Sequence, residues 1–270
     1  MVIAGAATAC VSLALLLVGR PGGVTLSRDA GAPAVPLLWA IGPALVGITI
    51  ALTLSHRRPR LVARTLSRGR LTATILILGA LAVLFPVVAS GMNGEDYVLT
   101  KAVLLIVAPL IAVALIRGSV TIDVERVAWR WWAPGIAILV WAVLRSLVSS
   151  SPDYSEVDAI TLLIAATATA VTAGFGEELF YRRLLQTRLE APLSPWAGVT
   201  VASAAFALMH LGSHATGDLL FDAASVIVVQ GSFGLLMGVI WMRFRNFTAI
   251  VTAHVLANGW PDIVWHVISR

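Results

Sequence analysis

Apolar segments of membrane-spanning length recur along the whole chain, from its first residues to its last. A helix needs about 20 mostly apolar residues to cross the hydrocarbon core of a bilayer. Charged residues make up only 12% of the sequence, against roughly 25% in soluble domains. The sequence therefore predicts an all-α, polytopic membrane helix bundle with about eight to nine transmembrane helices. The nine candidate spans are residues 2–18, 34–54, 71–92, 102–116, 133–150, 159–176, 193–212, 219–242 and 247–268, and the sixth helix is expected to continue beyond 176.

The basic residues lie mainly in short loops between these segments, where they set the orientation of the chain. Arginines gather after the second, fourth, sixth and eighth spans, and because cytoplasmic loops are rich in basic residues, this pattern predicts a cytoplasmic N-terminus. The formal charge of +5 therefore indicates contact with a lipid bilayer and no binding to nucleic acid. The single lysine, Lys101, falls at an opposite, outer loop, and we attribute its isolation to composition bias. An arginine-rich, lysine-poor composition is typical of a high-GC bacterium, so we expect a multi-pass protein of the bacterial inner membrane.

The only cysteine, Cys10, lies in the first apolar segment. A single thiol excludes an intrachain disulfide and a cysteine-based zinc site. The first segment also lacks a positively charged start and a small-residue cleavage site, so we expect a retained helix rather than a signal peptide.

Small residues concentrate in the sixth, seventh and eighth spans, for example at Gly234 and Gly238. Small residues four positions apart let membrane helices approach one another closely. We therefore expect these spans to form a tight inner bundle. Pro261 should break or kink the ninth span.

Two adjacent glutamates, Glu177 and Glu178, follow the apolar run of the sixth span. A charged side chain within the membrane costs about 2.5–3.5 kcal/mol on insertion scales and is a functional candidate by default. Glu178 and Arg182 are four residues apart, so they share a helix face and are expected to pair. Glu177 then points elsewhere and, in a partly desolvated site, suits a general base. The structural alternative is a juxtamembrane charge cluster that ends a helix.

Polar side chains also occur in the seventh and ninth spans. Phe206 and His210 share one helix face, and so do His254 and Asn258. Taken alone, His210 is typical of a buried histidine bonded to the backbone, and the second pair fits interhelical hydrogen bonding. A metal site made by His210 and His214 is disfavoured because Gly212 interrupts the helix between them and no His-Glu-x-x-His motif is present.

Three motifs taken in order resemble those of the CPBP family, the CAAX prenyl endopeptidase and bacteriocin-processing (Abi) intramembrane proteases. They are Glu177-Glu178-x-x-x-Arg182, Phe206-x-x-x-His210 and His254-x-x-x-Asn258. The resemblance covers roughly residues 159–262. It implies a catalytic helix core in residues 159–270, preceded by N-terminal transmembrane helices in residues 1–158 that lie outside the recognisable region. Tyr181 and Arg183 stand where many members have Phe and Gly, which weighs against a strict CAAX-processing role.

The family implies hydrolysis of a peptide bond in a membrane-associated protein or peptide. By this resemblance, Glu177 would activate a water with assistance from His210, and His254 and Asn258 would stabilise the oxyanion. The supporting residues would be Glu178, Arg182 and Phe206. As the spans are drawn, Glu177 lies at the cytoplasmic end of its helix and His210 toward the outer end of its own, although the reaction requires them to be close.

A zinc-dependent mechanism is the alternative. Glu177 or Glu178, together with His210 and His254, would supply suitable zinc ligands. We favour the metal-free mechanism because Asn258 is a poor zinc ligand but a good amide donor.

Two further functions compete with proteolysis. A non-catalytic membrane scaffold or bacteriocin self-immunity protein would keep the same helices but tolerate substitution of Glu177 and His254. A small-solute transporter is less favoured because the chain shows no internal repeat. For the protease, the inferred bacterial origin favours a substrate without a prenyl group.

Overall fold

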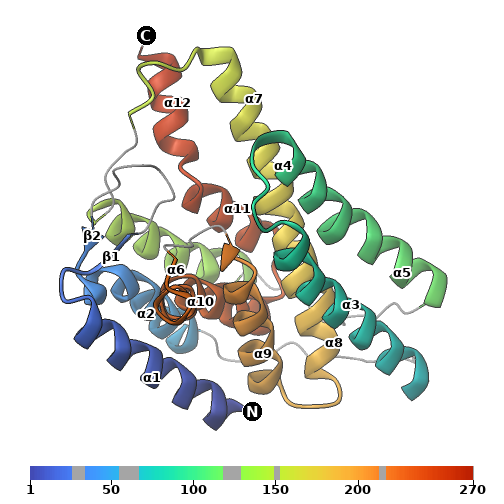
Figure 1. Cartoon of the computed structure of the whole chain (residues 1–270). Helices are drawn as coiled ribbons and strands as arrows, with labels where there is room; N and C mark the ends of the chain where they lie inside the picture. The colour runs from blue at the N-terminus through green and yellow to red at the C-terminus, as the bar shows by residue number, and fades with distance from the viewer. Residues whose placement is uncertain (26–33, 55–66, 118–128, 149–152, 213–216, 270) are drawn as a thin grey trace.

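The computed structural model describes residues 1–25, 34–54, 67–117, 129–148, 153–212 and 217–269, and these residues are almost entirely helical (Figure 1). The expected all-α fold is therefore confirmed, apart from two antiparallel strands of two residues each, β1 (Val24–Thr25) and β2 (Ala34–Val35). The helices of the N-terminal half are α1 (Val2–Gly19), α2 (Leu37–Thr53), α3 (Arg68–Val88), α4 (Gly94–Ala102), α5 (Ala108–Ile116) and α6 (Trp129–Ser146). A π-helical turn, η1 (Val103–Val107), joins α4 to α5 without a break.

The C-terminal half begins with one long continuous helix. It consists of α7 (Ala159–Thr169), the π-helical segment η2 (Ala170–Gln186) and α8 (Thr187–Glu190). Four helices follow: α9 (Pro195–Leu208), α10 (Leu219–Phe244), α11 (Phe247–Ala257) and α12 (Trp260–Ile268).

Five of the described helices are long and apolar enough to cross a membrane. They are Val2–Gly19, Arg68–Val88, Gly94–Ile116, Ala159–Glu190 and Leu219–Phe244, and three shorter apolar helices lie at Leu37–Thr53, Pro195–Leu208 and Phe247–Ala257. The chain is therefore a multi-pass membrane protein. Most of the arginine-rich loop 55–70, on which the predicted orientation depends, falls outside the described residues, so a cytoplasmic N-terminus stays a prediction.

Three predicted spans have different boundaries in the structure. The fourth begins at Gly94 rather than at 102, because Asn93 starts the helix and Glu95 and Asp96 occupy its first turn. Negatively charged side chains in the first turn stabilise a helix by interacting with its dipole. The sixth continues from 176 to Glu190. The ninth is broken, as Pro261 suggested: Gly259 adopts a positive φ of 79° between α11 and α12, a conformation that favours glycine.

Helix α10 forms the centre of the bundle. It is the most buried of the five long apolar helices. In its most apolar stretch of 18 residues, 61% of the residues are buried, whereas the corresponding share in α1 is only 11%. Gly234 packs against Phe206 and Ser203 of α9, and Gly238 packs against Val199. The tight inner bundle expected from the small residues is therefore present.

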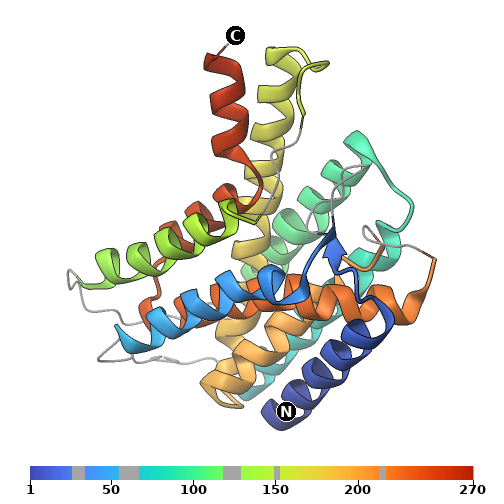
Figure 2. The ribbon, with the colours of Figure 1, turned by 90° about the vertical axis from the view of Figure 1, so that its left-hand side faces the viewer.

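Helices α7 and α12 project together from the rest of the protein, with the C-terminus at their tip (Figures 1 and 2). Leu162 and Ala166 of α7 pack against Ile263 of α12, and the Trp260 indole donates a hydrogen bond to the Ala166 carbonyl at 3.3 Å. The paired helices fix the start of the long helix that carries Glu177 and Glu178.

Candidate active site

The two glutamates lie inside the π-helical segment η2 rather than at a helix end. The long helix continues from them to Glu190, so the expectation that Glu177 marks the cytoplasmic end of its span was wrong. A π-helix has more residues per turn than an α-helix, so adjacent side chains diverge by roughly 80° instead of about 100°. Neighbouring carboxylates can therefore converge on one partner. Short π-helical segments are frequent at functional sites.

Two glycines bring other helices close to η2. A Cβ atom on Gly174 would lie 2.7 Å from Val255 Cγ2 of α11, and a Cβ on Gly176 would lie 2.9 Å from Ile106 Cδ1 of η1. Both separations are too short for real side chains. Gly174 thus allows the approach of the helix that carries His254, and Gly176 allows the approach of the helix that carries Lys101.

We expect Gly174→Ala to lower the thermal stability of the purified protein and to slow any reaction at the site. The added methyl group meets a stiff β-branched side chain, and such overpacking costs about 1–3 kcal/mol. Gly79→Ala is the matched control, because Gly79 also lies within a helix but has open space around its Cα. Thermal unfolding in detergent should show Gly79→Ala unchanged or stabilised, and equal effects of the two substitutions would contradict the packing argument.

Glu177 is buried, with 1% of its surface exposed, and its two oxygens have different surroundings. Oε1 accepts a hydrogen bond from Lys101 Nζ at 2.7 Å. Oε2 is buried without a hydrogen-bond partner among the described residues and lies 3.7 Å from His254 Nε2. The carboxylate is therefore held by a hydrogen bond at Oε1, whereas Oε2 has no hydrogen-bond partner among the described residues, and we call Oε2 the open oxygen.

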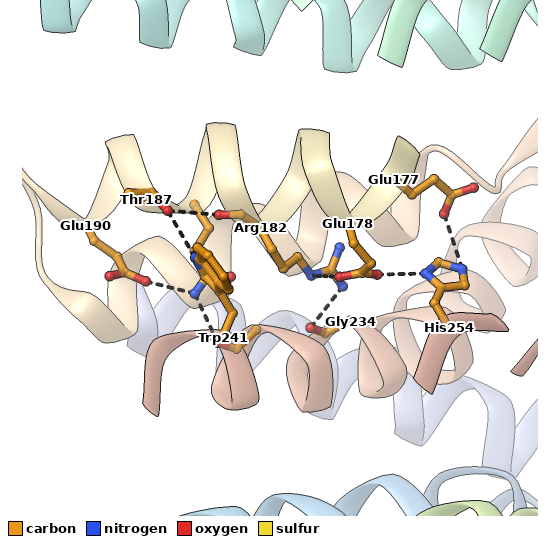
Figure 3. Close-up of polar contacts among 10 residues, drawn as sticks. Glu177, Glu178, Arg182, Thr187, Glu190, Gly234, Trp241 and His254 are labelled. Atoms are coloured by element: carbon orange, nitrogen blue, oxygen red, sulfur yellow. Dashed lines mark hydrogen bonds and ion pairs between the residues drawn. The ribbon is translucent and has the colours of Figure 1, made fainter. Parts of the chain in front are cut away.

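His254 lies between the two glutamates (Figure 3). Its Nδ1 is 2.7 Å from Glu178 Oε1, while its Nε2 faces Glu177. Because an ionised carboxylate can only accept hydrogen bonds, Nδ1 carries a proton and donates a hydrogen bond to Glu178 Oε1. This contact fixes the orientation of the imidazole ring.

Arg182 pairs with Glu178, as their spacing predicted. Arg182 Nε is 3.4 Å from Glu178 Oε2, and Arg182 Nη2 donates to the Gly234 carbonyl of α10 at 3.2 Å. The guanidinium carbon lies 4.3 Å from the centre of the Phe206 ring, within cation–π range. These contacts lie in the protein interior, since Glu178 and Arg182 are both 0% exposed.

The charges at the site balance. Two carboxylates, Glu177 and Glu178, face one ammonium group and one guanidinium group, those of Lys101 and Arg182. Buried charges are tolerated when they are paired and hydrogen-bonded.

Aromatic rings enclose the histidines. The Phe233 ring meets His254 edge-on at 5.2 Å between centroids, and Phe206 lies 5.9 Å from His254 and 4.9 Å from His210. His210 follows the end of α9, with Nδ1 2.9 Å from the Phe206 carbonyl, and it interacts electrostatically with Glu177. Because Phe206 lies against both His210 and His254, and His254 faces Glu177, the separation expected between Glu177 and His210 is not found. His214 lies outside the described residues.

Asn258 ends α11, and its backbone N–H donates to the His254 carbonyl at 3.1 Å. Its side-chain Nδ2 is buried without a hydrogen-bond partner among the described residues. The hydroxyl of Tyr181 is likewise buried and without such a partner in the described part of the chain. Unsatisfied buried polar groups are uncommon and point to a ligand or to function.

A polar row continues from the glutamates along the face of η2 and α8 that packs on α10. Gln186 donates to the Gly238 carbonyl at 3.0 Å, and the Trp241 indole donates to Thr187 Oγ1 at 3.0 Å (Figure 3). Glu190 ends the row in an ion pair with Arg245. These contacts advance along both helices in the same direction, so the two helices run parallel, as alternating spans six and eight require.

The turn between α10 and α11 is also fixed by polar contacts. Arg130 of α6 donates from Nε to the Phe244 carbonyl at 2.8 Å, and Asn246 Nδ2 donates to the Arg130 carbonyl at 3.0 Å. The Asn246 side chain caps α11 by accepting from the Ala249 N–H. The start of the helix that carries His254 is thereby held against α6.

The structure thus brings Glu177, Glu178, Arg182 and His254 into direct contact, with Phe206 and His210 beside them. Lys101 was missed: its assignment to an outer loop and to composition bias was wrong, because it lies in the last turn of α4 with its ammonium on Glu177. Its being the only lysine among 19 basic residues was the signal that marked it as exceptional.

The described side chains do not fit a zinc site in this arrangement. They contain no group of three or more His, Cys, Asp or Glu residues placed to hold a metal ion. Lys101 and Arg182 already neutralise Glu177 and Glu178, one of which would have to bind zinc together with the two histidines. A catalytic zinc usually takes three protein ligands, so we derive no step through a metal.

Comparison with known proteins identifies the part of the chain that carries this site. Residues 159–260 match the family model described as type II CAAX prenyl endopeptidase Rce1-like. Searches with the chain found no match among curated proteins and none among solved structures. The matched segment contains every member of the site except Lys101. Residues 159–260 are therefore similar to the Rce1-like type II CAAX prenyl endopeptidases, in agreement with the resemblance to the CPBP family.

Proposed function

We propose that the protein is an intramembrane endopeptidase that hydrolyses a peptide bond of a membrane-associated protein or peptide. The observation that carries the proposal is the open oxygen of Glu177: Oε2 is buried, has no hydrogen-bond partner among the described residues and faces His254 Nε2 at 3.7 Å. A buried polar atom without a hydrogen-bond partner calls for an explanation, and a catalytic role or a bound water is one. The family supports proteolysis as the reaction.

Glu177 acts as the general base. Its Oε2 takes a proton from a water molecule, and the water oxygen attacks the scissile carbonyl carbon. His210, whose ring lies 4.9 Å from that of Phe206, assists in orienting that water. When the tetrahedral intermediate collapses, the carbon–nitrogen bond breaks and Glu177 passes its proton to the leaving amine. The products are a new carboxyl terminus and a new amino terminus.

His254 and Asn258 stabilise the oxyanion. His254 is held through Nδ1 by Glu178, and its Nε2 is too far from Glu177, at 3.7 Å, for a direct hydrogen bond. Because Nδ1 already donates to Glu178, His254 offers Nε2–H to the oxyanion in its doubly protonated form, and the unpartnered Asn258 Nδ2 supplies a second donor. Donors that face a developing negative charge in a desolvated site contribute about 3–4 kcal/mol each to catalysis.

We expect the reaction to be independent of metal. Treatment of the purified protein with a strong chelator should leave the rate of cleavage within about twofold, since Lys101 and Arg182 occupy the cation positions beside the carboxylates. Loss of activity on chelation, with recovery on adding zinc, would contradict this expectation and favour a metalloprotease.

The substrate class follows from the setting of the site. The carboxylates lie within a helix long and apolar enough to cross a membrane, so we propose that the peptide bond is presented from the bilayer. We favour a substrate without a prenyl group, in a bacterial inner membrane with the N-terminus in the cytoplasm. Tyr181 and Arg183 in the motif depart from the pattern of many CAAX-processing members.

The test compares protein termini in membranes from cells that express the wild type or Glu177→Gln at matched levels. New termini that appear only with the wild type would support the protease and name its substrate. Identical termini in both membranes would favour the non-catalytic scaffold.

A further inference from the structure

Lys101 reaches the site from outside the family domain. It lies in α4, ahead of residues 159–260, and only 7% of its surface is exposed. Its ammonium is 2.7 Å from Glu177 Oε1 and 4.9 Å from the centre of the Tyr97 ring. A buried lysine of this kind has lost its hydration and requires a specific partner.

The contact is specific in its geometry. Lys101 binds one oxygen of Glu177 and leaves the other, Oε2, directed toward His254. An ammonium group is a compact point charge, whereas a guanidinium group is a planar fork that binds both oxygens of a carboxylate. Every other basic residue in the chain except the histidines is an arginine, so a lysine at this position stands apart from the composition.

We infer that Lys101 is a positioning residue for the proposed reaction: it anchors Oε1 of Glu177 so that Oε2 faces the attacking water and His254. The inference rests on the proposed function. It also assigns part of the reaction centre to the N-terminal helices. The packing of η1 against η2, which Gly176 permits, is what delivers the ammonium group to the carboxylate.

The ion pair is tested without reference to activity by comparing the thermal unfolding of Lys101→Met, Glu177→Gln and the double variant in detergent. Each single substitution removes one of the two opposite charges, whereas the double substitution removes both. We expect the double variant to recover much of the midpoint temperature lost by Lys101→Met. Strictly additive losses would overturn the inference, whether or not the protein cleaves anything.

The positioning role is tested by the kinetics of Lys101→Met and Lys101→Arg on a peptide that contains the cleavage site found by terminus comparison. We expect kcat to fall about 100-fold in Lys101→Met, the size of effect that a misplacement of about 1 Å produces, with KM little changed. Lys101→Arg should keep the stability of the wild type but also lose kcat, because its fork occupies both oxygens. Wild-type kcat in either variant would overturn the inference.

Arg245→Met is the matched control. It breaks another buried ion pair, between Arg245 and Glu190. The ion pairs of His254 involve Glu177 and Glu178 instead of Glu190. It should lower the midpoint temperature while kcat stays close to that of the wild type. If Arg245→Met lowers kcat as much as Lys101→Met does, the effect of Lys101 is one of stability alone. If the losses of stability in Lys101→Met and Glu177→Gln are not additive but the wild type cleaves no peptide, the ion pair is supported and the proposed protease is not.

Discussion

Glu177→Gln should lower the rate of peptide hydrolysis by about 10³-fold or more while the protein stays folded. A positioned general base contributes about 10²–10⁴ to the rate, and the amide of glutamine cannot take a proton from water. Folding is retained because the amide oxygen of glutamine can still accept from Lys101, the present partner of Oε1. The rate is measured with purified protein in proteoliposomes, and folding is checked by thermal unfolding.

Glu190→Gln provides the control for this substitution. Glu190 is a buried glutamate of the same long helix, and its partners are Arg245 and Gln186 rather than the histidines. We expect it to lower stability and to leave the rate within a few-fold of the wild type. If Glu177→Gln retained the wild-type rate, or if both substitutions slowed hydrolysis equally, Glu177 would not be the base.

Arg182→Met should cause the largest loss of stability of any single substitution at the site. It leaves Glu178 without its guanidinium partner, removes the hydrogen bond to the Gly234 carbonyl and removes the cation from the Phe206 ring. Breaking a buried ion pair on one side costs about 3–5 kcal/mol, which corresponds to a midpoint shift of roughly 10 °C in a protein of this size. Thermal unfolding in detergent measures the shift.

Arg183→Met tests whether the effect depends on burial. Arg183 is the next residue along the same helix but is exposed, so we expect a change within about 0.5 kcal/mol. The double variant Glu178→Gln/Arg182→Met should be more stable than Arg182→Met, since it leaves no lone buried carboxylate. Equal effects at positions 182 and 183 would mean that the Glu178–Arg182 pair does not hold the helices together.

Much of the fold followed from local rules. The length of the apolar segments predicted the membrane helices, and the small residues predicted the tight packing of α9 on α10. The spacing of Glu178 and Arg182 predicted their ion pair, because residues four apart meet on both α- and π-helices. The position of Pro261 predicted the break before α12.

The relation between the two glutamates and His254 did not follow from the sequence. α-Helical geometry directs Glu177 and Glu178 to different neighbours, whereas both lie against His254 in the π-helical segment. The i→i+5 pattern of a π-helix has no sequence signature comparable to a helix cap. The close approach of α11 depends on Gly174, whose partner is known only from the tertiary structure.

Lys101 escaped prediction for a different reason. A charge beside an apolar segment is ordinarily in a loop, and Glu95 and Asp96 nearby reinforced that interpretation. Those carboxylates instead begin α4, which carries Lys101 two turns further into the protein. The pairing of Lys101 with Glu177, 76 residues away, arises from helix packing and cannot be read from either segment alone.

The most direct test of the account is cleavage by the purified protein in proteoliposomes that contain the membrane peptides identified by terminus comparison. The wild type should generate new carboxyl and amino termini, in equal amounts, at one site. Glu177→Gln, folded to the same extent, should generate none. New termini with Glu177→Gln, or none with the folded wild type, would contradict the claim that the open carboxylate facing His254 is the centre of a protease.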